Sequence, residues 1–126
     1  MNNHTHFKRR ILVVDDERMV RDALFLLLSS QGHSVVTAAS GPDALALFEP
    51  GKFDLVFTDY FMPVMNGDKL AAEIKTRAPA QPVIAVTAYA DRLRQAPAAW
   101  FDAYLAKPFG LKQLRDLIEQ YVPPQP

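Results

Sequence analysis

Apolar residues along the chain follow two alternating patterns. The first is a short unbroken run, which occurs at residues 11–14, 35–39, 55–58, 83–86 and 103–105. Several of these runs are apolar at every position rather than at every second one, which is typical of strands covered on both faces. The runs therefore predict five strands of a parallel sheet.

The second pattern is the three- to four-residue spacing of an amphipathic helix. It occurs in segments that follow the apolar runs. The positions that form the apolar faces are Val20, Ala23, Leu24 and Leu27, then Leu70, Ile74 and Ala78, and finally Leu111, Leu114, Leu117, Ile118 and Tyr121. We expect these faces to be buried against the sheet.

Residues with strong capping and turn preferences separate the two patterns. Gly32 follows the first helix and suits a left-handed cap. Residues 40–43, Ser-Gly-Pro-Asp, match a capping box that opens the second helix. Pro79 and Pro82 close the third helix before the fourth strand. Five strand–helix repeats predict a three-layer α/β sandwich, with a five-stranded parallel sheet and five helices.

Composition narrows the class of protein. A chain of 126 residues fits one domain, and 49% hydrophobic residues argue against a disordered chain. Basic and acidic residues both number 14, so the zero net charge gives no electrostatic basis for direct nucleic-acid binding. The absence of cysteine excludes disulfides and thiolate metal sites, and it fits a cytoplasmic location. No apolar run is long enough for a membrane span or a secretion signal.

The two ends of the chain are expected to lie outside the domain. Residues 1–9 are polar and basic and are interpreted as a flexible tail. Residues 10–122 form the predicted domain. Residues 123–126, Pro-Pro-Gln-Pro, cannot extend a helix and are interpreted as a tail or the start of a linker.

Charged residues gather where the predicted strands end. Asp15 and Asp16 follow the first strand, Asp59 ends the third and Lys107 follows the fifth. Ligands of open α/β sheets bind beyond these carboxyl ends. Three carboxylates facing one lysine should attract a cation, and oxygen ligands without histidine or cysteine favour a hard ion such as Mg²⁺.

The same edge of the sheet is suited to phosphoryl transfer. A phosphoryl group between Mg²⁺, Lys107 and the hydroxyl of Thr87 would have the positioning and charge stabilisation that this chemistry needs. Asp59 is the candidate nucleophile because it stands alone on its strand. The adjacent Asp15 and Asp16 suit metal binding.

Four motifs in order make the chain similar to a known family. They are Ile-Leu-Val-Val-Asp-Asp-Glu at 11–17, Asp-Tyr-Phe-Met-Pro-Val-Met-Asn-Gly at 59–67, Val-Thr-Ala at 86–88 and Tyr-Leu-Ala-Lys-Pro-Phe at 104–109. The chain thereby resembles the receiver domain of two-component response regulators, from about residue 10 to residue 122. The resemblance implies a flavodoxin-like, doubly wound sheet with strand order 2-1-3-4-5, and a phosphoacceptor signalling switch.

The resemblance also implies roles for the site residues. Asp59 would accept a phosphoryl group from a histidine kinase or a histidine phosphotransfer protein. Mg²⁺ or Mn²⁺ would be held by Asp15 or Asp16, by Asp59 and by the backbone carbonyl of Phe61. Lys107, which precedes a cis proline in the family, would pair with the phosphoryl oxygens.

A conformational switch is the next implication of the resemblance. Thr87 would move to hydrogen-bond the phosphoryl group, and Tyr104 would rotate inward behind it. The surface of the fourth helix, fifth strand and fifth helix would respond by binding a downstream protein, a fused effector domain or a second copy in a phosphorylation-dependent homodimer. Such a domain is not an enzyme in the usual sense, since it catalyses only its own phosphorylation and dephosphorylation.

Residues 91–101 depart from the family pattern. Pro97 interrupts the fourth helix, and Trp100 and Phe101 stand where the family has Gly-Ala. We expect a fourth helix that is short, distorted or partly unwound. Trp100 and Phe101 would then either form an exposed partner surface or repack into the gap left by the missing helical turn.

Two ring residues are predicted to set how long the phosphoryl group lasts. Phe61 and Tyr89 lie two residues after Asp59 and Thr87 respectively. In the family these positions flank the path of the attacking water. Two bulky rings there predict slow hydrolysis.

Three other functions remain as alternatives. A Mg²⁺-dependent phosphatase of the haloacid dehalogenase type needs a second acid where Phe61 stands, as well as a substrate cap. A flavodoxin-like cofactor binder needs a phosphate-cradling loop where the acidic residues 15–17 stand, and the five glycines form no such motif. A receiver-like binding module that is never phosphorylated is disfavoured because every expected site residue is present.

Overall fold

The computed structural model describes residues 8–95 and 100–123, which form five strand–helix units in sequence. The elements are β1 (Arg10–Val14), α1 (Arg18–Ser30), β2 (Ser34–Ala38), α2 (Gly41–Leu47), β3 (Leu55–Asp59), α3 (Gly67–Arg77), β4 (Val83–Thr87), α4 (Ala90–Gln95), β5 (Ala103–Ala106) and α5 (Leu111–Tyr121). Every predicted strand is present within one residue of its expected bounds.

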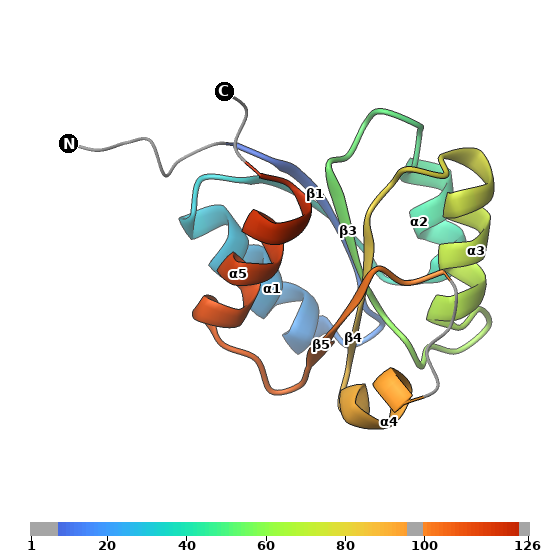
Figure 1. The fold of residues 1–126 in the computed structure, drawn as a ribbon. Helices are drawn as coiled ribbons and strands as arrows, with labels where there is room; N and C mark the ends of the chain where they lie inside the picture. The colour runs from blue at the N-terminus through green and yellow to red at the C-terminus, as the bar shows by residue number, and fades with distance from the viewer. Residues whose placement is uncertain (1–7, 96–99, 124–126) are drawn as a thin grey trace.

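The five strands form one parallel sheet in the order β2-β1-β3-β4-β5, which confirms the predicted topology. Helices α1 and α5 cover one face of the sheet, and α2 and α3 cover the other (Figure 1). The carboxyl ends of all the strands lie at one edge of the sheet, near α4 (Figure 1). This edge positions the candidate site.

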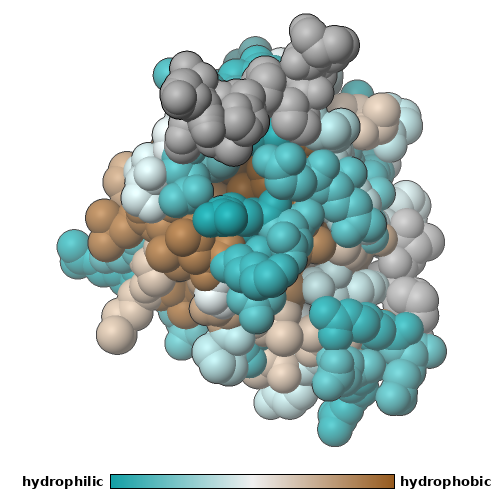
Figure 2. Space-filling model, turned by 60° about the vertical axis from the view of Figure 1, so that its left-hand side comes forward, coloured by the Kyte–Doolittle hydropathy of each residue, from teal (hydrophilic) through white to brown (hydrophobic). Residues whose placement is uncertain are grey.

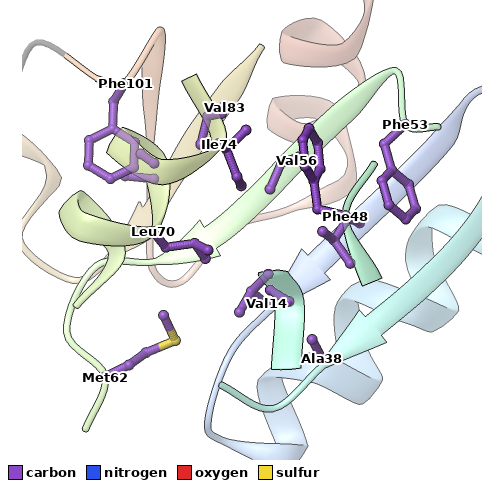
Figure 3. Close-up of a cluster of buried hydrophobic side chains, with 14 of the residues drawn as sticks. Val14, Ala38, Phe48, Phe53, Val56, Met62, Leu70, Ile74, Val83 and Phe101 are labelled. Carbon is purple, nitrogen blue, oxygen red and sulfur yellow. The ribbon is translucent and has the colours of Figure 1, made fainter. Parts of the chain in front are cut away.

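The core has two halves, one on each side of the sheet. Alternate residues of β1 face opposite ways: Ile11 and Val13 pack towards α1 and α5, whereas Leu12 and Val14 pack towards α2 and α3. Figure 3 shows the second half, in which Val14 and Val56 lie among aromatic and aliphatic side chains. Burial on both faces, which is complete along β3 and β4, explains why several strands are apolar at nearly every position.

Helix α1 buries the predicted face except at one position, since Val20, Leu24 and Leu27 all pack on the core. Leu24 and Leu28 are buried, but Ala23, which was expected in the core, is exposed. The outward side carries the exposed apolar residues Met19, Phe25 and Leu26. Figure 2, turned to bring the α1 and α5 side forward, shows apolar surface next to hydrophilic side chains on this face.

Both predicted helix caps are present. Gly32 has a φ of +89°, and its N–H donates to the carbonyl of Ser29 at 2.9 Å. The Ser40 hydroxyl accepts a hydrogen bond from the Asp43 N–H at 3.1 Å and caps α2. These local signals fix where α1 ends and α2 begins.

Arg9 belongs to the domain rather than to the predicted tail. It is only 3% exposed, and its Nε and Nη2 atoms donate to the Val122 carbonyl at 3.1 and 2.8 Å. Its backbone N–H donates to Nδ1 of His33 at 3.1 Å. The predicted boundary at residue 10 is therefore wrong by at least one residue, while residues 1–7 and 124–126 lie outside the described part.

The described part of helix α4 runs from Ala90 to Gln95, and the prediction of a short or distorted helix depends on the residues that follow. Pro97 lies outside the described residues. The Arg94 guanidinium ties the helix to β5 by donating to the carbonyl of Tyr104 at 2.9 Å. None of the helices within residues 8–95 and 100–123 is long and apolar enough to cross a membrane.

Candidate functional site

Three carboxylates converge at the carboxyl ends of β1 and β3. Oxygen atoms of Asp15, Asp16 and Asp59 all lie within 4.8 Å of one another. Asp15 and Asp59 are buried, whereas Asp16 is exposed to solvent. Because β1 and β3 are parallel neighbours, their ends bring together acids that are more than 40 positions apart in the sequence.

Lys107, which follows β5, provides the positive charge of the cluster. Its Nζ atom lies 3.2 Å from Oδ2 of Asp15 and 3.3 Å from Oδ1 of Asp59. Glu17, to which the sequence assigned no role, contributes a third carboxylate at 3.7 Å. The Lys107-Pro108 peptide bond is cis, as expected from the resemblance.

Burial, together with the nearby charges, shifts the pKa of Asp15, Asp59 and Lys107. Burial, with the nearby charge of Asp15, raises the pKa of Asp59 to about 6 despite the opposing effect of Lys107. Burial also raises the pKa of Asp15. Burial alone would lower the pKa of Lys107, but the charges of Asp15 and Asp59 outweigh it and raise that pKa. The cluster therefore carries excess negative charge that one lysine does not neutralise.

The two carboxylate oxygens of Asp15 have different partners. Oδ1 accepts a hydrogen bond from the Glu17 N–H at 2.9 Å. Oδ2 is fully buried and has no hydrogen bond among the described residues, although it forms the ion pair with Lys107. A buried carboxylate oxygen that pairs with a single ammonium keeps lone-pair sites for a second cation. The donor set, which is oxygen only, and this atom together fit Mg²⁺.

The chain that follows β3 is held tightly behind Asp59. The N–H of Gly67 donates to the carbonyl of Tyr60 at 2.7 Å, and a Cβ at Gly67 would lie only 2.3 Å from the Asp59 carbonyl oxygen. Only glycine permits this close approach of α3 to the end of β3. Gly67 is the last residue of the motif at 59–67, but the spacing of that motif does not predict the close contact between Gly67 and Asp59.

The ring residues Phe61 and Tyr89 meet beside the acidic cluster. Their ring centroids are 5.6 Å apart in an edge-to-face arrangement, and each residue is 52% exposed. The Tyr89 N–H donates to the Thr87 hydroxyl oxygen at 3.1 Å, and Thr87 itself is buried. Together with Arg92 and Leu93, the two rings line an apolar hollow of about 420 Å³.

Comparison with known proteins agrees with this geometry. Residues 11–119 match the response regulator receiver domain family. This chain belongs to that family. Because the match covers most of the chain, the fold, the acidic pocket and the signalling class are those of a receiver domain.

Two curated relatives illustrate where such receiver domains occur. The chain is 38% identical over 114 residues to the response regulator protein FleR of Pseudomonas aeruginosa, covering 89% of this chain and 24% of FleR. It is 37% identical over 119 residues to the sensor kinase CckA of Brucella abortus, covering 91% of this chain and 13% of CckA. The chain thus spans less than a quarter of the length of either relative.

A solved structure supports the same conclusion. The response regulator protein TrrA of Thermotoga maritima, solved in complex with Mg²⁺-BeF, superposes with a TM-score of 0.82 at 35% identity. The match covers 90% of this chain and 99% of TrrA. Neither the phosphatase nor the flavodoxin-like alternative is favoured by these similarities.

The remaining candidate residues of the receiver domain divide into buried and exposed groups. Tyr104 and Phe101 are buried, with ring centroids 5.7 Å apart, and Phe101 also packs on Tyr60 at 5.8 Å. Phe101 therefore belongs to the core and is not part of an exposed partner surface. Trp100 is 43% exposed and remains available at the surface.

Proposed function

We propose that this receiver domain is a phosphorylation switch in which Asp59 is the phosphoacceptor. The observation that supports this role is the position of its carboxylate, which is buried at the end of β3 with Oδ1 3.3 Å from the Lys107 ammonium. An acceptor needs a carboxylate oxygen, a nearby cation and an open path for the donor. Among the three clustered acids, Asp59 alone is the final residue of a strand.

The residues that would hold Mg²⁺, or Mn²⁺ in its place, are Asp15, Asp16, Asp59 and the backbone carbonyl of Phe61. The clustering of the three carboxylates within 4.8 Å supports this assignment, as does the Mg²⁺-BeF complex of TrrA. When bound, the ion supplies the positive charge that lets phosphoryl oxygens approach three carboxylates. We propose that exposed Asp16 contributes to this site from its solvent side.

In the proposed reaction, a carboxylate oxygen of Asp59 attacks the phosphorus of a phosphohistidine. The new P–O bond forms as the P–N bond breaks, and the electron pair of the P–N bond returns to the imidazole nitrogen. Lys107 offsets the charge on the phosphoryl oxygens during transfer. The donor is proposed to be a histidine kinase or a histidine phosphotransfer protein, acting in the cytoplasm.

The switch is proposed to begin at Thr87. Its hydroxyl oxygen accepts the Tyr89 N–H in the present state. Turning this hydroxyl towards a phosphoryl group would alter that hydrogen bond and shift the loop that leads into α4. We propose that Tyr104 responds next, and that the surface of α4, β5 and α5 with exposed Trp100 then changes its population of states.

The output of the switch is proposed to be binding at that surface. The occupant would be a downstream protein, a fused effector domain or a second copy of the chain after phosphorylation. Matched relatives that are several times longer than this chain support a role alongside other domains. In this account, phosphorylation and dephosphorylation of Asp59 are the only reactions that the domain catalyses.

Intact-protein mass after incubation with acetyl phosphate and Mg²⁺ tests the proposal. We expect the mass of one added phosphoryl group, and we expect it to be absent without Mg²⁺ and in Asp59→Asn. Asp68→Asn is the matched control, because Asp68 lies on α3 outside the acidic cluster. No mass gain by folded protein that binds Mg²⁺ would support a binding module that is not phosphorylated.

Phe61 and Tyr89 are proposed to prolong the phosphorylated state. Their rings meet at 5.6 Å beside the site and obstruct the approach of water. We expect the double variant Phe61→Asn, Tyr89→Glu to lose its phosphoryl group roughly tenfold faster, which corresponds to about 1.4 kcal/mol in the barrier. Loss of phosphate at the same rate, or more slowly, in the double variant would contradict the proposal.

A further inference from the structure

Arg21 on α1 spans the loop between β1 and α1 with two hydrogen bonds. Its Nη1 atom donates to the backbone carbonyl of Asp15 at 2.9 Å. Its backbone N–H donates to the carbonyl of Glu17 at 3.0 Å, which is the first helical hydrogen bond of α1. One residue therefore holds both ends of the segment 15–17, which carries Asp15 and Asp16 of the acidic cluster.

The beginning of α1 lacks the side chains that usually fix a helix N-terminus. Glu17 occupies the N-cap position, but its side chain makes no capping hydrogen bond, and no acidic residue lies in the first turn. The guanidinium of Arg21 reaches back across this turn instead. Within residues 8–95 and 100–123 it forms no ion pair, and its partner is the carbonyl of Asp15.

Asp15 is held at its backbone and at its carboxylate. Its N–H donates to the Ala38 carbonyl at 3.2 Å, and its carbonyl accepts from Arg21. Its Oδ1 atom accepts from the Glu17 N–H at 2.9 Å, and its Oδ2 atom pairs with Lys107 at 3.2 Å. Lys107 is itself part of the site, so Arg21 is the one side chain outside the site that holds Asp15 in the described part of the chain.

The placement of the carboxylates matters because Mg²⁺ tolerates little variation in geometry. The ion requires near-octahedral coordination at about 2.0–2.1 Å. Asp59 is the last residue of β3 and is fixed by the sheet, whereas Asp15 and Asp16 follow β1 in an irregular segment. Loss of a residue that orients metal ligands typically weakens metal binding by roughly 10- to 100-fold.

The charge of Arg21 and its hydrogen bond should affect a bound cation in opposite directions. A guanidinium near the site repels a divalent cation. Removal of the charge alone should therefore tighten Mg²⁺ binding, whereas loss of the hydrogen bond to the Asp15 carbonyl should weaken it. The sign of the change in affinity separates a positioning role from simple electrostatics.

We propose that Arg21 is a positioning residue for the Mg²⁺ site. By holding the carbonyl of Asp15, its guanidinium sets where the carboxylates of Asp15 and Asp16 lie, and thereby sets the affinity for the ion. This inference rests on the Mg²⁺ site of the proposed function. It adds to that site a residue on α1 that contacts neither the ion nor the phosphoryl group.

Calorimetric titration with Mg²⁺ alone, without a phosphoryl donor, tests this role. We expect Arg21→Gln to raise the Kd for Mg²⁺ roughly tenfold. Arg21→Lys keeps the charge and a hydrogen-bond donor, so it should raise the Kd less than Arg21→Gln does.

Arg18→Gln is the matched control because it removes the same charge from the same helix. The Arg18 side chain is 84% exposed and pairs with Asp22 at 3.5 Å rather than with the loop. We expect its Kd for Mg²⁺ to be unchanged or slightly lower. Equal or tighter binding by Arg21→Gln, or the same weakening in Arg18→Gln, would overturn the positioning role.

Urea denaturation in the presence of a chelator checks that each variant is folded before the titration. If Arg21→Gln does not fold, the comparison of Arg21→Lys with the unchanged protein decides the question. A higher Kd for Arg21→Lys would then support the role, and an unchanged Kd would overturn it.

Failure of this inference can be distinguished from failure of the proposed function. If Arg21→Gln binds Mg²⁺ as tightly as the unchanged protein while acetyl phosphate labels Asp59, only the positioning role fails. If Arg21→Gln weakens Mg²⁺ binding but Asp59 is not labelled, the phosphoacceptor role fails and the positioning role stands. An absence of Mg²⁺ binding by the unchanged protein would overturn the positioning role whatever the labelling shows.

Discussion

At the scale of single residues, the buried negative charge that the acidic cluster needs for its function lowers the stability of the fold. Asp59 is held beside Asp15 in a buried position, and its pKa of about 6 shows that its ionised form is disfavoured. The pKa of Asp59 in the fold lies above its ordinary value of 3.8, so protonation favours the folded state. This contribution is complete at low pH and is lost as the pH rises through about 6.

The first prediction concerns removal of that charge. In metal-free protein, Asp59→Asn should raise the free energy of unfolding by up to roughly 3 kcal/mol at pH 7.5, and by almost nothing near pH 4. Urea denaturation in the presence of a chelator measures the difference at both pH values. Equal effects of the substitution at the two pH values would show that the charge of Asp59 is not disfavoured in the fold.

The second prediction concerns the glycine behind the phosphoacceptor. Gly67→Ala should lower the free energy of unfolding by about 1–3 kcal/mol, because the new Cβ would overlap the Asp59 carbonyl. Gly110→Ala is the matched control, since its Cβ meets only the end of the flexible Gln113 side chain. Similar denaturation midpoints for Gly67→Ala and the unchanged protein would contradict the close approach.

At the scale of elements, the loop between β3 and α3 adopts a conformation that its sequence does not favour. Val64 has a φ of +73°, although it is β-branched, and the Met65 N–H donates to the Pro63 carbonyl at 2.8 Å across it. The Met62 N–H donates to the Asn66 side-chain oxygen at 3.4 Å. Buried Met62 and these hydrogen bonds hold the loop in a strained form.

The third prediction is that relieving this strain stabilises the protein. Val64→Gly should raise the free energy of unfolding by about 1 kcal/mol, because glycine adopts a positive φ without steric cost and the exposed valine loses little packing. Val64→Ile keeps the β-branch and should leave stability unchanged. Thermal denaturation measures both variants, and a lower Tm for Val64→Gly would contradict the interpretation.

The elements differ in how far their sequence predicts them. Strands that are buried on both faces give unbroken apolar runs, so their positions and parallel arrangement follow from the pattern. The exact limits of the buried face of α1 do not, because residues 24–28 are four leucines and a phenylalanine, and several faces look equally apolar. In the fold, Leu24 and Leu28 are buried against the sheet, whereas Phe25 and Leu26 are exposed.

At the scale of the whole molecule, Arg9 joins the beginning of the domain to its end. Its guanidinium donates twice to the Val122 carbonyl and lies 3.4 Å from Oε2 of Glu119. These residues are more than 100 positions apart in the sequence. The polar composition of the N-terminal segment suggested a tail, and only the tertiary fold reveals the partner of Arg9.

The fourth prediction tests this junction. Arg9→Ala should lower the free energy of unfolding by about 2–3 kcal/mol, because it removes buried hydrogen bonds from a charged donor. Glu119→Ala is the control and should cost less than about 1 kcal/mol, since Glu119 is largely exposed. Hydrogen exchange near the end of α5 should accelerate only in Arg9→Ala, and unchanged exchange there would argue against the junction.

The site was more predictable than the contacts that support it. Acids at the ends of parallel strands must meet at one edge of the sheet, so the grouping of Asp15, Asp59 and Lys107 follows from element order. The sequence left two alternatives open for Phe101, because its burial depends on Tyr60 and Tyr104 packing around its ring. Side-chain packing between distant segments leaves no periodic signal in the sequence.

Chemical location of the phosphoryl group is the most direct test of the account. After incubation with acetyl phosphate and Mg²⁺, borohydride reduces an aspartyl phosphate to homoserine, and peptide mass mapping identifies the reduced residue. The account predicts homoserine at position 59, with Asp15 and Asp16 unchanged. Homoserine at position 15 or 16 would contradict the central role of Asp59. A gain of the phosphoryl mass with no homoserine at 15, 16 or 59 would contradict it as well.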